Sequence, residues 1–386
     1  MFLPTKNLED FSIVKLEDLG WSESFAHSFE CWIEPHAGKD YQVGRVAIAH
    51  RSQYHLYTAH GNTTATLTGK FRHQAQTTED FPAVGDWVVV RPQPETPQYL
   101  IDAVLPRRSQ VVRQASGTRT TAQLIATNID TLFLVSGLDH DFNLRRIERY
   151  LSLAWKSGAQ PVVILNKADV CVNIEEKQKA VEESAIAVPF IPLSALHQDN
   201  LTALNPYLNP GKTVALLGSS GVGKSTLTNQ LLGKEQQTTQ AVREDDSRGR
   251  HTTTHREMLI LPSGALLIDT PGMRELQLWS TDQTTDQGSG SLHLWEGAES
   301  GIEETFQDIE KLAAQCRFRN CQHGSEPGCA IQAAIDSGEL SHKRWNSYQK
   351  LQREQAYQHR RQDKQAQSNA KARWKHITKT VRQNRK

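Results

Sequence analysis

The chain has 386 residues, which is long enough for two or three domains and at least one full hydrophobic core. Hydrophobic residues make up 37% of it, and no apolar run approaches the ~20 residues that a membrane-spanning helix needs. The first residues lack the basic flank and apolar stretch of a secretion signal. The lack of a long apolar run argues against a membrane-spanning protein. Five cysteines are too few for a disulfide framework, and three of them lie within 316–329, which predicts a reducing, cytoplasmic location.

The net charge of +1 conceals two regions of opposite charge. Residues 343–386 contain 14 Lys/Arg and two acidic residues, a local charge of +12, which leaves −11 for the rest of the chain. A solvated helix face is the ordinary explanation of such a run. Because the tail also mixes an aromatic, Trp374, with Lys and Arg, we expect it to bind an RNA backbone.

The N-terminal part of the chain predicts a short leader followed by a small β-barrel. Residues 1–40 have weak periodicity and are assigned to the leader. Residues 41–112 contain five short β-rich runs broken by Gly, Pro and polar turns. The OB-fold is one such barrel, and periodicity alone leaves other small β-domains equally open. The five runs are 44–49, 54–58, 63–67, 86–91 and 100–105.

From residue 113 to residue 280, apolar runs alternate with helix-like stretches such as 144–156 and 174–184. This pattern predicts an α/β domain with a parallel sheet covered on both faces. The Gly/Ser-containing stretch 281–300 is expected to be a flexible insertion. Residues 301–386 are expected to form a mostly α-helical C-terminal domain with the basic tail. The apolar runs are 131–135, 162–165, 188–191, 214–217 and 266–268.

A phosphate-binding loop is predicted between an apolar run and an apparent helix, where the sequence fits G-x-x-x-x-G-K-[ST]. Glycines let backbone N–H groups approach phosphate oxygens, Lys224 can reach the β- and γ-phosphates, and Ser225 can bind Mg²⁺. A chance match is the alternative, and the strand-loop-helix setting argues against it. The predicted contacts are Gly218, Ser219, Ser220, Gly221, Val222, Gly223, Lys224, Ser225 and Thr226.

A guanine site is predicted from the string N-K-A-D at 166–169, directly after an apolar run. The Asp169 carboxylate can accept hydrogen bonds from N1–H and the exocyclic amine of guanine, which adenine cannot offer. The stem of Lys167 is expected to pack on the base, and a backbone N–H at 194–196 could contact the guanine oxygen. Alone, such a string is most often a surface turn. The predicted base contacts are Asn166, Lys167, Asp169, Ser194 and Ala195.

A magnesium and switch site is predicted from the string D-T-P-G that begins at Asp269. Asp269 can bind Mg²⁺ through water, and the N–H of Gly272 can sense the γ-phosphate. The polar stretch 249–254 reads G-R-H-T-T-T, and one of its threonines, taken as Thr253, could complete the Mg²⁺ shell. The joint occurrence of these motifs at strand ends, where a doubly wound sheet places its ligand contacts, predicts GTP binding.

The water-positioning group of ordinary Ras-like enzymes, a glutamine after the D-x-x-G glycine, is replaced here by Met273. Methionine can neither donate nor accept usefully, so we expect slow intrinsic hydrolysis. His251 is the candidate for positioning water, and a solvent-exposed loop histidine is the alternative. With Lys224 and Thr253, His251 completes the predicted catalytic set.

The order of the motifs indicates a circularly permuted GTPase. Ordinary GTPases run from the phosphate loop through D-x-x-G to N-K-x-D and S-A-x, whereas here N-K-x-D and S-A-x come first. The same site can be built if the old termini are joined and a new break opens elsewhere. Compact domains tolerate this because their termini are often close together at the surface.

The pattern Cys316-x4-Cys321-x-His323-x5-Cys329 places three thiolates and an imidazole within fourteen residues. This is a ligand set for one tetrahedral structural Zn²⁺, with no position left open for catalysis. The metal would stabilise a region too small to form its own core. Inert buried thiols and a redox pair are the alternatives.

The permuted order, the small barrel in front and the Cys/His cluster behind resemble the ribosome small-subunit-dependent GTPase family, RsgA, also called YjeQ or YloQ. The resemblance implies an OB-fold, a permuted P-loop GTPase domain and a zinc-binding C-terminal domain. It also implies slow GTP hydrolysis stimulated by the 30S subunit, and a role in late 30S maturation that includes release of an assembly factor. The family's proposed catalytic histidine falls on His251. The leader and the 281–300 insertion exceed the compact family pattern.

The partners implied are the 30S subunit with its 16S rRNA, and GTP or GDP with Mg²⁺; we expect a monomer without membrane contact. Two other functions are possible on the residues alone. A P-loop ATPase or kinase is disfavoured by Asp169. An RNA-binding assembly protein that holds GTP as a regulatory ligand is favoured by Met273 and disfavoured by Lys224, Ser225 and Asp269.

Overall fold

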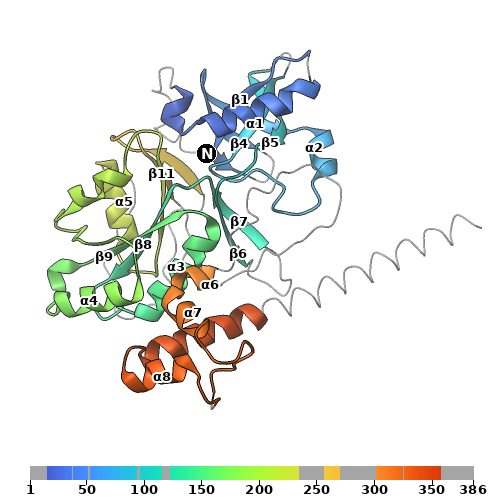
Figure 1. The fold of residues 1–386 in the computed structure, drawn as a ribbon. Helices are drawn as coiled ribbons and strands as arrows, with labels where there is room; N and C mark the ends of the chain where they lie inside the picture. Colours follow the sequence, from blue (N-terminus) through green and yellow to red (C-terminus); the bar gives the residue numbers. More distant parts are fainter. Residues whose placement is uncertain are drawn as a thin grey trace, which may run out of the picture. The chain divides into compact units, whose positions relative to one another are not determined.

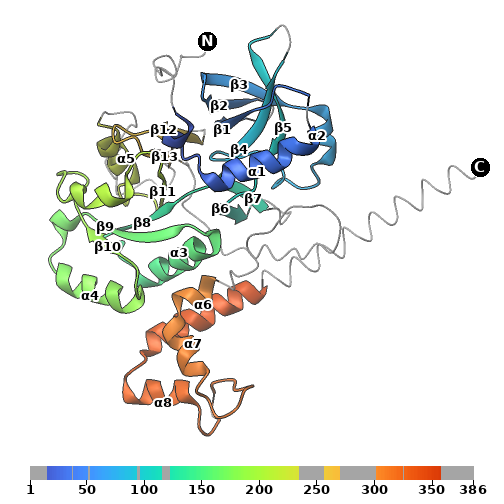
Figure 2. The same ribbon diagram turned by 45° about the horizontal axis from the view of Figure 1, so that its top comes forward.

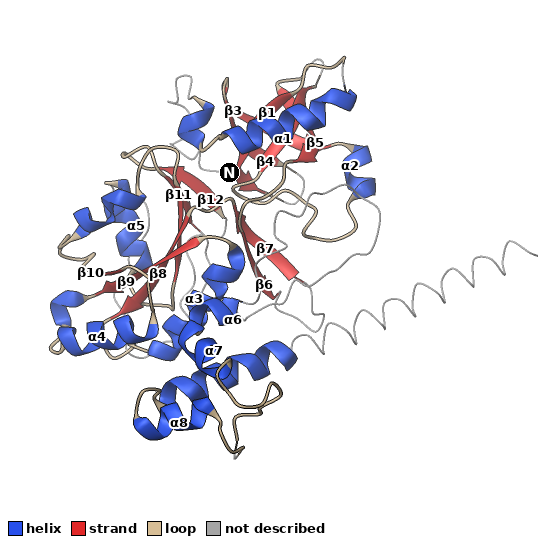
Figure 3. Cartoon of the chain, in the orientation of Figure 1, coloured by secondary structure: helices blue, strands red, loops and turns tan. Residues whose placement is uncertain are grey.

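The computed structural model describes residues 15–36, 38–50, 53–93, 96–114, 122–233, 256–269, 301–324 and 326–357. These residues belong to two compact units (Figure 1). The first holds β-strands and helices of both the barrel and the α/β domain, and the second consists mainly of helices (Figure 3). Within the described ranges, none of the helices combines the length and apolarity required to cross a membrane.

The N-terminal β domain is a closed five-stranded barrel. Its strands run in the order β1-β2-β3-β5-β4, and a pairing of β1 with β4 closes the sheet. The β3–β5 pair is parallel and the others are antiparallel. This is the OB-fold topology, so the barrel prediction is confirmed and the alternative small β folds are removed. The elements are β1 (Gln42–Ala49), β2 (Tyr54–Thr58), β3 (Gly61–Leu67), α2 (Gly69–Gln74), β4 (Trp87–Pro92) and β5 (Gln98–Val104).

Residues 15–36, which lie in the stretch expected as a leader, form helices that pack on the barrel. Phe25 is buried and stacks on Trp21, whose ring meets the edge of Trp87 of β4 at a centroid distance of 4.7 Å. These aromatic contacts hold the short helix against the barrel, although its sequence has weak periodicity. The elements are η1 (Leu16–Leu19), α1 (Glu23–Ile33) and η2 (Glu34–His36). Residues 1–14 lie outside the described ranges.

The α/β domain has a mostly parallel sheet in the order β10-β9-β8-β11-β13-β12, in which only β12 is antiparallel to its neighbour. Helices α3 and α4 lie on one face and α5 on the other (Figure 2). The continuous apolar runs of the sequence are these doubly covered strands. The elements are β8 (Thr131–Gly137), α3 (Leu144–Ser157), β9 (Gln160–Asn166), η3 (Ala168–Val170), α4 (Ile174–Ser184), β10 (Phe190–Pro192), η4 (Leu201–Tyr207), β11 (Thr213–Leu217), α5 (Lys224–Leu232), β12 (Glu257–Ile260) and β13 (Leu266–Asp269).

A fully buried arginine, Arg45, ties the barrel to the α/β domain. Its guanidinium donates hydrogen bonds to the carbonyl oxygens of Leu19, Gly85 and Asn128, which belong to three separate segments. Burial lowers the pKa of Arg45 to about 10, so the side chain stays charged at neutral pH. A separate two-stranded sheet, β6 (Gln110–Gln114) with β7 (Ala122–Thr127), lies on the path between the barrel and β8.

The C-terminal unit is helical, as the sequence predicts. Buried residues such as Phe306, Ile331 and Trp345 form its core. The Arg344 guanidinium donates two hydrogen bonds, of 2.7 and 2.8 Å, to the two carboxylate oxygens of Asp308 and so forms a bidentate pair. The elements are α6 (Gly301–Thr305), α7 (Gln307–Ala313), α8 (Ala330–Ser337) and a further helix over 342–357. The predicted insertion at 281–300 and the tail beyond residue 357 lie outside the described ranges.

Candidate nucleotide site and Cys/His cluster

The phosphate-loop motif turns from β11 into the nine-residue helix α5. Gly221 and Gly223 have positive φ angles of 78° and 95°, which L side chains rarely adopt. The Lys224 ammonium donates hydrogen bonds of 2.7 and 2.5 Å to the carbonyl oxygens of Gly218 and Ser219. The loop therefore curls around a lysine at the start of a helix, where backbone N–H groups and the helix dipole can hold phosphate.

The buried Asn166 joins the phosphate loop to the S-A-x loop. Its Nδ2 donates to the carbonyl oxygen of Val222 at 2.7 Å, and its Oδ1 accepts from the backbone N–H of Ala195 at 2.9 Å. A Cβ at Gly223 would lie 2.2 Å from this Nδ2, so only glycine allows the two loops to approach so closely. Segments 56 residues apart are thus held together by one side chain.

The base-recognition motif follows β9 in a tight turn. Lys167 adopts a left-handed backbone conformation with φ of 64°, and Asp169 lies in η3 directly after it. The backbone N–H of Ala168 donates to the carbonyl oxygen of Leu193, which ties this turn to the strand that precedes Ser194. The Asp169 carboxylate lies 3.7 Å from the exposed His197 ring. A carboxylate beside the S-A-x loop has the chemistry needed to read guanine.

Asp269 lies at the end of β13, which pairs in parallel with β11, the strand that leads into the phosphate loop. Ser225 lies in the first turn of α5. Burial, together with the nearby Asp269 charge, raises the pKa of Glu257, its cross-strand neighbour. The predicted His251, Thr253 and Gly272 lie outside the described residues, as does Met273. Of the predicted magnesium and switch residues, the structure therefore describes Ser225 and Asp269.

Three side chains near these loops, Asp139, Asp141 and Arg146, were not predicted from the sequence. Lys167 pairs with Asp139 at 2.6 Å, and Arg146 contacts both Asp141 and Ser219, the second residue of the phosphate loop. Asp139 and Asp141 lie in the loop 138–143 after β8. The sequence could have indicated these residues, because two aspartates follow the end of a predicted strand and precede an Asn that caps the next helix.

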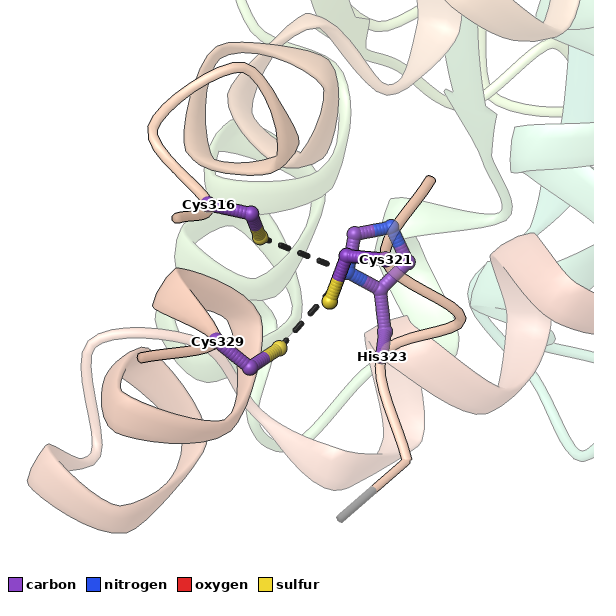
Figure 4. Close-up of side chains that lie close together, drawn as sticks. All are labelled: Cys316, Cys321, His323 and Cys329. Atoms are coloured by element: carbon purple, nitrogen blue, oxygen red, sulfur yellow. Dashed lines mark hydrogen bonds between the residues drawn. The ribbon is translucent and has the colours of Figure 1, made fainter. Parts of the chain in front are cut away.

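The four predicted zinc ligands come together in the C-terminal unit (Figure 4). Their ligand atoms all lie within 4.8 Å of one another, and Nδ1 of His323 is 3.5 Å from Sγ of Cys316 and 3.6 Å from Sγ of Cys329. A tetrahedral zinc with bonds of ~2.3 Å to sulfur and ~2.0–2.1 Å to nitrogen requires such separations. The fourth ligand atom belongs to Cys321. The donor set and its spacing therefore fit a structural zinc ion.

The start of helix α8 supports the thiolate form of one ligand. Desolvation acts to raise the pKa of Cys316, but the backbone N–H groups of Ala330 and Ile331 lower it overall. The Gln332 side chain donates to the carbonyl oxygen of His323 at 2.7 Å and fixes the backbone of that ligand. Metal binding requires deprotonated cysteine, which these contacts favour at Cys316.

The described nucleotide motifs all follow parallel strands, β9, β10, β11 and β13, and so lie at one edge of the sheet. This arrangement is that of a P-loop GTPase. Because the base-recognition strand β9 precedes the phosphate-loop strand β11 in the chain, the domain is circularly permuted.

Known proteins place the chain in a particular family. The family model described as RsgA GTPase matches residues 104–279. The "Small ribosomal subunit biogenesis GTPase RsgA" of Opitutus terrae is 49% identical over 370 residues, covering 94% of this chain and 95% of the relative. The protein of the same name in Methanosarcina acetivorans is 38% identical, covering 95% and 92%. The chain therefore belongs to the RsgA GTPase family, and it is a GTPase, a hydrolase that acts on GTP.

Solved structures agree with the fold. YjeQ from Thermotoga maritima is 25% identical, with a TM-score of 0.58, over 81% of this chain and 97% of that chain. YloQ, described as a circularly permuted GTPase, is 25% identical, with a TM-score of 0.55, over 82% and 95%. The permutation inferred from motif order and strand order is thus confirmed.

Proposed function

We propose that this GTPase acts in biogenesis of the small ribosomal subunit, where it binds the immature 30S particle through 16S rRNA and leaves it after hydrolysing GTP. The relatives that share most of the chain carry that role in their names. The observation that supports the proposal is the pair of Asn166 hydrogen bonds, which join the predicted guanine-binding loop to the phosphate loop. We further propose that the protein works as a monomer in the cytoplasm.

In this proposal the two ends of GTP are held by separate loops. Asp169 selects guanine, the Lys167 stem packs on the base, and the backbone N–H groups that follow Gly218 hold the phosphates together with Lys224. Mg²⁺ would be held by Ser225, Thr253 and Asp269 and would neutralise charge on the β- and γ-phosphates. The Gly272 N–H would sense the γ-phosphate.

Hydrolysis requires a positioned water, and Met273 cannot orient one. We assign that task to His251, in the stretch between α5 and β12. We then expect slow hydrolysis by the protein alone and faster hydrolysis when the ribosomal subunit positions His251. The chain leads from Asp269 and Gly272 to the C-terminal region. A nucleotide-driven movement at Gly272 could therefore act on that region through the connecting chain.

The direct test is GTP turnover measured alone and with purified 30S subunits, 50S subunits or naked 16S rRNA. We expect marked stimulation by 30S subunits and little by the other two. Normal GTP binding without any 30S stimulation would contradict the ribosomal role. Single-turnover kinetics decide the second candidate, an RNA-binding assembly protein that holds GTP as a regulatory ligand: a bound GTP that stays intact on 30S particles would support it.

Replacing Cys316 with serine is expected to abolish zinc binding and to unfold the C-terminal unit. A structural zinc site contributes folding free energy directly, and three ligands hold the ion far less well than four. Metal analysis of the purified protein and limited proteolysis would measure the loss. Cys31→Ser, an exposed cysteine on α1, is the matched control and should keep one zinc per chain. Equal zinc content in both variants would contradict the assignment.

Replacing Phe318 with alanine is expected to weaken binding to 30S subunits about tenfold. Phe318 is 44% exposed in the zinc loop, and the guanidinium of Arg317 lies 5.5 Å from its ring centroid. An aromatic ring beside exposed arginines suits an unstacked RNA base, and such stacking contributes ~1–3 kcal/mol per base. Co-sedimentation with 30S particles is the measurement. Ile186→Ala, which changes an apolar residue of the α/β domain that is 50% exposed, should bind as wild type.

A further inference from the structure

The loop 138–143, between β8 and α3, contacts both nucleotide loops through two aspartates. Asp139 reaches the base-recognition motif, and Asp141 reaches the phosphate loop. Neither residue belongs to a nucleotide-binding motif. Because they are separated by a single residue, one short loop spans the distance between the two ends of the candidate site.

The base-side contact is short and well supported. Asp139 Oδ2 accepts from Lys167 Nζ at 2.6 Å, and its Oδ1 accepts from the backbone N–H of Asp141 at 3.1 Å. Burial alone would raise the pKa of Asp139, but these hydrogen bonds lower it, so the carboxylate stays ionised. A Cβ at residue 137 would lie 2.7 Å from Asp139 Oδ1, and Gly137 leaves that space free.

The phosphate-side contact is a closed three-way cluster. Asp141 Oδ2 accepts from Arg146 at 2.6 Å and from the Ser219 hydroxyl at 2.7 Å, while the same Arg146 nitrogen lies 2.7 Å from that hydroxyl. Arg146 is in the first turn of α3, where Asn143 caps the helix. The side chain of the second phosphate-loop residue is therefore fixed to a helix outside the loop.

The loop itself is anchored at its first residue. The backbone N–H of Leu138 donates to the carbonyl oxygen of Asn166 at 2.8 Å, and its carbonyl oxygen accepts from Lys177 at 2.5 Å. Exposed ion pairs contribute little in general. Here, however, the Asp139 side chain is only 15% exposed, and each aspartate makes more than one hydrogen bond from an anchored backbone. Such preorganised contacts fix side-chain positions.

We propose that Asp139 and Asp141 are positioning residues that hold Lys167 against the guanine base and Ser219 in the phosphate-binding shape of its loop. The proposal rests on the proposed GTP site. It assigns the two aspartates different tasks, because Lys167 serves the base and Ser219 the phosphates. Loss of Asp139 should weaken the binding of every guanine nucleotide equally. Loss of Asp141 should weaken the binding only of those nucleotides whose phosphates reach the phosphate loop.

The experiment compares full-length Asp139→Asn and Asp141→Asn with wild type in titrations of fluorescent GDP, competed by GMP, GDP and GTP. Both changes keep the side-chain shape and remove the charge. Asp139→Asn should raise all three dissociation constants about tenfold, equivalent to about 1.4 kcal/mol. Asp141→Asn should raise those for GDP and GTP about tenfold and that for GMP by less than twofold. His140→Ala, the exposed residue between them, is the control and should match wild type.

Two further variants separate positioning from folding. Asp139→Glu and Asp141→Glu retain the charge and should recover most of the lost affinity, while thermal melting should place all four aspartate variants close to wild type. The proposal would be overturned if both asparagine variants bound all three nucleotides as wild type does. It would also be overturned if Asp141→Asn weakened the binding of GMP as much as that of GDP. If wild-type protein itself fails to bind guanine nucleotides, the proposed GTP site is wrong, and that result is distinct from a failure of the variants alone.

Discussion

Replacing Asp169 with asparagine should lower the affinity for GTP about a thousandfold and allow xanthosine triphosphate to bind instead. The carboxylate is expected to accept two charge-assisted hydrogen bonds from guanine, each worth ~1.5–3 kcal/mol. Asparagine would present a donor to the guanine amine and leave that group unpaired. In xanthine an oxygen replaces this amine, so the amide N–H gains an acceptor. Competition titrations with GTP, ATP and xanthosine triphosphate measure the change.

Asp199→Asn provides the matched control, because it makes the same chemical change at an exposed carboxylate in the S-A-x loop. Its nucleotide affinities should equal those of wild type. Should Asp169→Asn retain its preference for GTP over the other two nucleotides, the base-selectivity argument would fail. The preference for guanine would then have to come from other contacts in the site.

Replacing Asn166 with alanine should lower the affinity for GTP and for GDP about a hundredfold and lower the melting temperature of the protein. The side chain is 2% exposed and makes both of the contacts that join the two loops. Its loss leaves the carbonyl oxygen of Val222 and the N–H of Ala195 without these partners, at ~1–3 kcal/mol for each buried group. Nucleotide titration together with thermal unfolding followed by circular dichroism measures both effects.

Asn209→Ala is a suitable control for this variant. Asn209 is exposed, and its side chain donates to the nearby Pro206 carbonyl oxygen at 3.0 Å. This change should leave nucleotide affinity and melting temperature near those of wild type. Wild-type GTP affinity in Asn166→Ala would show that the two loops keep their positions without the Asn166 hydrogen bonds, and would contradict this prediction.

The sequence predicts the fold well where one periodicity dominates. The five barrel runs and the apolar runs of the α/β domain coincide closely with strands, because alternation and continuous burial each leave a clear pattern. Strand β12 was not expected, since four residues at an antiparallel edge carry little periodic signal. Helix α1 was also missed because its packing depends on a few aromatic contacts with a distant strand.

The candidate site divides in the same way. Motifs of fixed local spacing, such as the phosphate loop and the Cys/His cluster, were predictable because the chemistry sets the spacing. Contacts between loops were not: the pairing of Asp139 with Lys167 joins residues 28 apart, and that of Asp141 with Ser219 joins residues 78 apart. Such pairs depend on which strands are neighbours in the sheet, and the local spacing of a motif does not reveal strand adjacency.

The site described above requires that two loops in inverted sequence order hold opposite ends of one nucleotide. A crystal structure of the protein with Mg²⁺ and a non-hydrolysable GTP analogue tests it directly. We expect a single nucleotide whose base is hydrogen-bonded to Asp169 and whose phosphates are within hydrogen-bond distance of Lys224 Nζ. A base bound away from Asp169, or phosphates held outside the loop that begins at Gly218, would contradict it.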